Sequence, residues 1–269
     1  MASFSDSPLE IIEEIIDNLQ DQLPALRACS QTCHFLLPLC RKYIFRSISL
    51  KHRSWQEQCE GLPRHTTLFA TLLDSSPDIA DYVQNLVYQL ETPPFTDPDA
   101  LRILKKLHRI QSFQLLGENS FWNELHPTLQ KSLLHIIHLR SVTHLKISYF
   151  RFFSISTLTS CVNLTDLTLS NIMSAGMDAC EHEYFAQDAV PQLQSFTLDL
   201  WGRYGNSFVN RRGSKDFPML DFSNLQTLSV IIDENSDIAA VHALTKVTEK
   251  LETLYYSGMY QNPSFISRD

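Results

Sequence analysis

Cysteine and histidine side chains near the start of the chain have the types and the close spacing that could bind a metal ion. Cys29, Cys33, His34 and Cys40 form this group. A zinc site normally groups its ligands as pairs that fold back on each other, whereas these four residues fall in one stretch of helical pattern. Because free cysteine is among the most frequently buried residue types, we predict core thiols here and no metal ligand.

Other residues with catalytic potential are scattered along the chain. Cys180 and His182 have no second pair nearby, and His182-Glu183 is not followed by a second histidine at zincin spacing. The sequence also contains no phosphate-binding loop, no dinucleotide-binding glycine motif and no nucleophile elbow. We therefore predict no catalytic residue and no cofactor. A hydrolase whose serine, histidine and aspartate converge in space is kept as a third hypothesis.

Composition favours a folded protein without a nucleic acid or membrane partner. The chain has 269 residues, of which 43% are hydrophobic and 19% charged, and its formal net charge is -8. No basic cluster would release counterions from a phosphate backbone, and no apolar stretch reaches the roughly 18 to 20 residues that cross a bilayer. Its 6 cysteines lie at irregular intervals, which suits reduced thiols better than a disulfide framework. We expect an intracellular protein of the cytoplasm, the nucleus or both.

Helical patterns fill the N-terminal part of the chain. Ser7-Pro8-Leu9-Glu10 predicts a capping box, with Pro8 at the first helical position. From there apolar residues recur at helical spacing in two rows, with acidic residues on the opposite side. Residues 21–24 interrupt this helix, residues 25–30 predict a second helix, and residues 33–45 carry a third apolar face. Three short helices make a marginal core, so we expect an apolar row to remain exposed for a partner.

Four segments of this region have a characteristic order and spacing. They are Pro8-Leu9-Glu10-Ile11-Ile12, Ile15-Ile16-Asp17-Asn18-Leu19, Leu26-Arg27-Ala28-Cys29-Ser30 with Cys33, and Leu36-Leu37-Pro38 with Phe45. Together they resemble the F-box motif of fungal, basidiomycete-type F-box proteins. The resemblance runs along the whole motif, and the four segments together are more specific than any one of them.

The resemblance implies a docking site for a Skp-type adaptor, which links to a cullin scaffold and a ubiquitin-conjugating enzyme. It places the contact on the first helix, with two supporting leucines elsewhere: Pro8, Leu9, Ile11, Ile12, Ile15 and Ile16, supported by Leu26 and Leu36. The alternative is that these side chains make the core of the motif itself, since apolar stripes are usually core. For Pro8 and Ile11 we favour the interface.

A repeated spacing of apolar residues runs through the rest of the chain. The pattern apolar-x-x-apolar-x-apolar suits a strand that lines a leucine-rich solenoid, and its first positions recur at intervals of roughly 22 to 38 residues. The matches are Phe45/Ile48/Leu50, Val83/Leu86/Tyr88, Ile110/Phe113/Leu115, Val142/Leu145/Ile147, Leu164/Leu167/Leu169, Leu193/Phe196/Leu198, Leu225/Leu228/Val230 and Leu251/Leu254/Tyr256. Helix-compatible segments lie between them at residues 66–73, 99–107, 128–137 and 238–247.

The pattern over residues 45–256 resembles divergent leucine-rich repeats. We therefore predict an α/β (α+β) fold. In this fold a three-helix F-box over residues 1–47 precedes an irregular, leucine-rich-repeat-like solenoid of strands and helices over residues 48–269. Two segments interrupt the repeats, residues 173–191 and 201–218. The second is rich in basic residues, and we weigh a loop that contacts acidic partners against a solvated linker.

Alternation along each predicted strand places the intervening residues on the concave face of the solenoid. They are mostly polar, and we predict that this face binds a target protein, whose identity the sequence does not give. The residues singled out are Asn85, Gln114, His144, Lys146, Asp166, Thr168, Thr197 and Tyr255. The alternative is a solvated sheet face without a dedicated ligand, because polar-out alternation is ordinary for half-buried strands.

Two functional hypotheses stand beside the hydrolase. The first is a non-catalytic, substrate-recognition subunit of a Skp/cullin/F-box ubiquitin ligase, in which the helices dock the adaptor and the repeats bind a target. The second is a repeat scaffold whose F-box only caps the solenoid and recruits no ligase. Burial of Pro8, Ile11 and Ile15 under the repeats would favour the scaffold.

Overall fold

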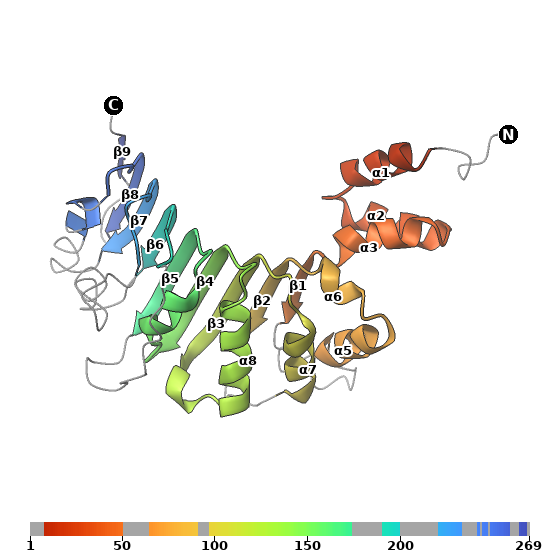
Figure 1. Ribbon diagram of the computed structural model, residues 1–269, viewed down its shortest axis with the longest axis horizontal. Helices are drawn as coiled ribbons and strands as arrows, with labels where there is room; N and C mark the ends of the chain where they lie inside the picture. The colour runs from red at the N-terminus through yellow and green to blue at the C-terminus, as the bar shows by residue number, and fades with distance from the viewer. Residues whose placement is uncertain are drawn as a thin grey trace.

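The computed structural model describes residues 8–50, 65–90, 97–173, 190–199, 220–232, 241–258 without 243 and 247, and 264–267. In these residues the chain is a mixed α/β protein built on one sheet of 9 strands in sequence order. Figure 1 shows the strands side by side across the molecule, with the first helices standing away from them at the N-terminal end. Among the described helices, none has the length and apolar character needed to span a bilayer.

Three helices form the N-terminal end, α1 (Leu9–Asn18), α2 (Leu23–Thr32) and α3 (Leu36–Ile44). The interruption predicted at residues 21–24 is too long, because α2 begins at Leu23 and holds Pro24 in its first turn. Proline is tolerated there, since the amide that it lacks has no partner within a helix. Pro8 precedes α1 as its N-cap instead of opening the helix. Ser7 of the predicted capping box lies outside the described residues.

A small apolar core holds these three helices together. Its buried members are Ile12 and Ile16 of α1, Leu26 of α2, and Leu36 and Cys40 of α3. The Tyr43 hydroxyl of α3 also donates a hydrogen bond to the Asp17 carboxylate of α1. This core is separate from the larger one under the sheet, so the three helices pack as a unit of their own.

The sheet follows the order of the chain. Its strands are β1 (Ser47–Leu50), β2 (Asn85–Gln89), β3 (Ser112–Phe121), β4 (His144–Arg151), β5 (Asp166–Met173), β6 (Ser195–Asp199), β7 (Thr227–Ile232), β8 (Thr253–Gly258) and β9 (Ser264–Ser267). From β1 to β8 each strand runs parallel to the next, whereas β9 pairs antiparallel with β8. The strands expected at the eight pattern matches are confirmed. The pattern does not predict β9, because that segment lacks the repeated spacing.

The register places corresponding positions of the repeated pattern side by side. Residues at the second apolar position of each match pair with one another from β1 to β8, and those at the third position do the same. Phe113, Leu145, Leu167 and Phe196 occupy the second position, and all four are buried. Burial of such a side chain contributes about 1.5–3 kcal/mol. The spacing that predicts the strands is therefore the spacing of the core.

Helices cover one face of the sheet. They are α5 (His65–Ser75), α6 (Ile79–Tyr82), α7 (Pro98–Lys106) and α8 (Pro127–Ile137), with short 3-10 helices η2 (Trp122–Glu124) and η3 (Ile155–Ser160). Figure 1 shows α5, α7 and α8 on the same side of the strands, and their apolar side chains share one core with the strands. The helices predicted at residues 66–73, 99–107 and 128–137 are confirmed.

The last predicted helix, residues 238–247, is described only in part. Residues 241, 242 and 244–246 are helical, while 238–240, 243 and 247 lie outside the described residues. Val241 and Leu244 pack against the core under the sheet. The described part of this segment therefore agrees with the predicted helix.

Polar contacts join α5 to α7 at the surface of the helical layer. Asp97 caps α7 by accepting a hydrogen bond from an amide of its first turn, and the Thr66 hydroxyl of α5 reaches the same carboxylate at 2.8 Å. Asp74 of α5 pairs with Arg102 and Lys106 of α7. A hydrogen bond from Lys106 and the charge of Arg102 hold the pKa of the Asp74 carboxyl below its usual value. Because these groups are exposed, we expect the ion pairs to add little to stability.

Replacement of Leu167 by alanine tests whether the strand pattern forms the core. Leu167 of β5 is 1% exposed, and its truncation should lower the free energy of unfolding by about 2–5 kcal/mol because it leaves a cavity. The neighbouring Thr168 points to the other face, so Thr168→Ala should change stability by less than about 1 kcal/mol. Urea unfolding of both variants measures the difference. Equal effects would contradict the assigned faces.

Cysteine alkylation tests burial at another point of the fold. Burial raises the pKa of the Cys161 thiol to about 12, so very little of the reactive thiolate is present at neutral pH. Cys33 is exposed. Iodoacetamide should label Cys33 in the folded chain and reach Cys161 only after addition of urea, as followed by peptide mass spectrometry. Labelling of both thiols at the same rate in the folded chain would rule out this burial.

Candidate functional site

The first helix exposes a row of apolar side chains. Leu9, Ile11 and Ile15 are 45%, 49% and 43% exposed, and Pro8 before them is exposed as well. We call these four residues the α1 apolar row. Pro8, Ile11 and Ile15 are spaced three and four residues apart, which places them on one face of a helix. None of the four is packed under the sheet.

Four other residues predicted for this docking site are buried. Ile12 and Ile16 lie in the core of the three helices, so neither side chain is on the surface of the free chain. Leu26 and Leu36 lie in the same core, which is compatible with the supporting role predicted for them. A helix with apolar residues on two faces buries one row and exposes the other. The sequence pattern does not fully separate the two rows, because each contains two isoleucines.

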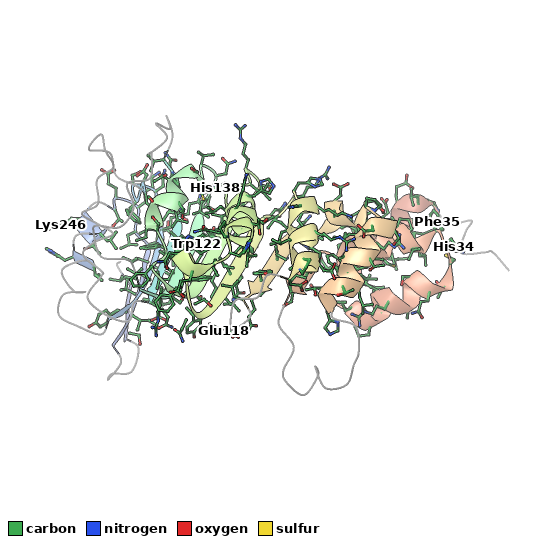
Figure 2. All side chains as sticks on the ribbon, turned by 90° about the horizontal axis from the view of Figure 1, so that it is seen from below. His34, Phe35, Glu118, Trp122, His138 and Lys246 are labelled. Carbon is green, nitrogen blue, oxygen red and sulfur yellow. The ribbon has the colours of Figure 1, made fainter. Side chains whose placement is uncertain are left out.

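Two further apolar side chains of these helices are exposed, Leu23 at 41% and Phe35 at 48%. Figure 2 labels Phe35 beside His34 at the helical end of the molecule. The pattern does not predict their exposure. Leu23 falls in the stretch interpreted as an interruption, and Phe35 precedes α3 instead of lying on its apolar face. An aromatic residue directly before a helix is the signal that could have identified Phe35.

The sheet face opposite the helices is mostly polar. All eight residues predicted for target binding lie on it, in two adjacent rows of the register. The first row holds Asn85, His144 and Asp166, and the second holds Gln114, Lys146, Thr168, Thr197 and Tyr255. We call this surface the polar sheet face. Figure 2 shows Glu118 of β3 and His138, which follows α8, at opposite edges of the molecule.

A histidine and an aspartate pair on the polar sheet face. His144 Nε2 lies 3.3 Å from the Asp166 carboxylate of the next strand, and His144 Nδ1 lies 2.8 Å from the Thr143 hydroxyl. A hydroxyl, an imidazole and a carboxylate in line are the parts that the hydrolase hypothesis requires. The His144 side chain is 58% exposed, so the group lacks the water-excluded setting in which such parts gain catalytic power. This geometry supports polar recognition better than catalysis.

Aromatic residues at the ends of β3 and β4 form a feature that the strand pattern does not predict. Tyr149 and Phe152 are 46% and 39% exposed. The Phe152 ring lies 5.5 Å from the ring of Phe121, and the Arg151 guanidinium lies 5.3 Å from the Phe121 centroid. The signal is present in residues 149–153, an aromatic run interrupted by one arginine. This run begins two residues after Ile147, the last apolar position of the match Val142/Leu145/Ile147.

In the part of the chain that the structure describes, no group of three or more His, Cys, Asp or Glu side chains could hold a metal ion. Among the cysteines predicted as core thiols, Cys40 is buried, Cys29 is half-buried and Cys33 is exposed. Burial raises the pKa of the Cys40 thiol, with smaller contributions from the other two thiols. The core prediction is wrong for Cys33 because this residue follows the end of α2 and, like His34, faces solvent.

The two predicted insertions lie almost entirely outside the described residues. Only residues 173 and 190–191 of the first are described, and none of residues 201–218. Cys180 and His182 belong to the undescribed part. Neither the contact loop nor the solvated linker weighed for the second insertion is therefore tested.

No model of a protein family matches the chain, and no curated protein matches it. The two candidate surfaces therefore rest on the geometry of the chain itself.

A glycine substitution tests the packing at the aromatic end of β3 and β4. The register of these strands shifts between Leu116 and Ser120, and a Cβ on Gly117 would lie 2.6 Å from the Phe150 ring and from the Tyr149 carbonyl oxygen. Gly117→Ala should therefore lower the free energy of unfolding by about 1–3 kcal/mol in urea.

Asn119 provides the control for this substitution. Its φ of 65° is left-handed, so Asn119→Gly should leave stability unchanged or raise it, because glycine adopts this conformation without a Cβ clash. An alanine at position 117 that left the protein as stable as the wild type would contradict the close approach of the two strands.

Proposed function

We propose that this chain is the substrate-recognition subunit of a Skp/cullin/F-box ubiquitin ligase, active in the cytoplasm or the nucleus. In this proposal α1 to α3 are an F-box that docks a Skp-type adaptor, and the sheet with its helices is a divergent leucine-rich-repeat solenoid that binds the target. Ubiquitin chemistry takes place on other subunits. The observation that carries the proposal is that the α1 apolar row is exposed, although the three helices already have a buried core of their own.

The exposed row supports a docking role on energetic grounds. Full burial of an isoleucine or leucine is worth about 1.5–3 kcal/mol relative to exposure, and Leu9, Ile11 and Ile15 forgo much of this in the isolated chain. Clustered apolar exposure of this kind is characteristic of interaction sites. A partner that covers the row would recover the lost burial.

The connection between the helices and the sheet supports the same role. Only Phe45 and Arg46 separate α3 from β1, and the Phe45 ring stacks on Phe69 of α5 with centroids 6.3 Å apart. The Arg46 carbonyl accepts hydrogen bonds from the amides of Gln84 and Asn85 at 2.9 Å. Such a short, bonded connection would hold a docked adaptor at a fixed distance from a bound target.

The scaffold alternative assigns the three helices only a capping role. It requires the apolar row to be packed against the repeats, whereas Pro8, Ile11 and Ile15 are exposed. Contact between α3 and α6 is compatible with either hypothesis. Exposure of the row therefore favours the proposed ligase subunit over the scaffold.

Paired charge substitutions test the docking site. Purified full-length chain should co-elute with a recombinant Skp-type adaptor in size-exclusion chromatography, and Ile11→Asp with Ile15→Asp should abolish the complex, because a carboxylate cannot be buried unpaired at an apolar interface. Both side chains are exposed in the free chain, so the variant should keep its melting temperature.

Leu68→Asp is the matched control, because Leu68 is a 53% exposed leucine on α5, outside the α1 apolar row. This variant should bind the adaptor like the wild type. Absence of a wild-type complex, or a complex that tolerates both aspartates in α1, would overturn the proposal.

A further inference from the structure

In three adjacent strands, the alternation of side chains between the two faces of the sheet is interrupted at neighbouring positions. Glu118 and Asn119 of β3, Tyr149 of β4 and Asn171 of β5 all have left-handed φ angles, of 46°, 65°, 61° and 51°. The register pairs Leu116 with Ser148 before the break and Ser120 with Phe150 after it. Between β4 and β5 it pairs Ser148 with Ser170 and then Phe150 with Ile172. The irregular residues of the three strands therefore lie side by side.

The break turns aromatic and basic side chains toward the polar sheet face. Before it, Leu145 and Ile147 of β4 are buried in the core, and after it Phe150 is buried there. Tyr149 and Arg151 flank Phe150 and, since side chains alternate along a strand, point to the opposite face. A tyrosine with left-handed φ is strained and persists only where its surroundings enforce that conformation. Such strain clusters at binding sites.

Within the described residues, two basic side chains of β4 have no acidic partner. Lys146 and Arg151 lie on the same face of β4, and among the described residues neither has a carboxylate within ion-pair distance. The neighbouring acids are engaged elsewhere: Asp166 with His144 and Glu118 with Gln89. Lys146 and Arg151 are therefore two cations without an acidic partner among the described residues, on a chain whose net charge is -8.

We propose that Lys146, Tyr149, Arg151, Phe121 and Phe152, here called the β4 patch, bind an acidic peptide segment of the target in which a carboxylate adjoins an aromatic or aliphatic side chain. Arg151 would pair with the carboxylate and the rings would cover the apolar side chain. The proposal rests on the proposed function, because it names the kind of target segment that the polar sheet face takes. Two cations on an acidic chain suit a short acidic peptide better than a polyanionic nucleic acid.

Selection from random peptides tests the patch even though the target is unidentified. The immobilised full-length chain is used to select from a phage-displayed library of short random peptides. Selected peptides should be enriched in Asp or Glu next to Phe, Tyr, Trp or Leu. Absence of any selected peptide, or selection without acidic enrichment, would overturn the proposal.

Binding of the best selected peptide then identifies the residues involved. Fluorescence polarisation with the labelled peptide should show at least about tenfold weaker binding to the Lys146→Gln, Arg151→Gln variant, because it loses its charge-assisted contacts. Tyr149→Ala should weaken binding as well. Lys105→Gln is the matched control, since Lys105 is an exposed lysine on α7, and it should bind like the wild type. Unchanged binding by the Lys146 and Arg151 double variant would place the peptide elsewhere and refute the patch.

Adaptor binding distinguishes the β4-patch proposal from the ligase function on which it rests. The Lys146→Gln, Arg151→Gln variant should still co-elute with the adaptor, because the substitutions lie on the sheet and not on α1. Failure of the wild-type chain to select acidic peptides, while it still forms the adaptor complex, would refute the β4 patch alone. A chain that selects acidic peptides but binds no adaptor would refute the ligase assignment and leave the patch in place.

Discussion

Stacking of apolar side chains across the parallel strands is the interaction on which the rest of this structure depends. Leu145, Leu167 and Phe196 pair in register on consecutive strands and are buried together. Because side chains alternate along a strand, a shift of one residue would turn the whole set toward solvent. The register therefore decides at once which face the helices cover and which face stays polar.

This constraint also separates the two candidate surfaces. The polar sheet face is available because α5, α7 and α8 occupy the other side. The α1 apolar row lies on helices with a core of their own, joined to β1 through Phe45 and Arg46. In the function proposed here this arrangement lets two partners bind the chain at once, because neither partner needs the surface of the other.

The sequence predicts the strands well because the repeated spacing is itself the pattern of core contacts. It predicts the exposed and buried sides of α1 less completely. Ile11 and Ile12 are adjacent and chemically identical, and only the packing of α2 and α3 decides which of them is buried. The break across β3 to β5 is harder still to predict, because its left-handed residues include Tyr149 and Asn171 instead of glycines. Asparagine adopts this conformation more readily than most residues, whereas propensity argues against it for tyrosine, so tertiary packing must impose it at Tyr149.

Quantitative affinity purification of the tagged full-length chain from its native cells tests most directly whether it bridges a ligase and a target through separate surfaces. Three forms are compared: the wild type, a form with aspartates at positions 11 and 15, and a form with glutamines at positions 146 and 151. The account predicts that the first variant loses adaptor and cullin but keeps the target, while the second loses only the target. Recovery of cullin with the aspartate form, or loss of every partner from both variants, would contradict it.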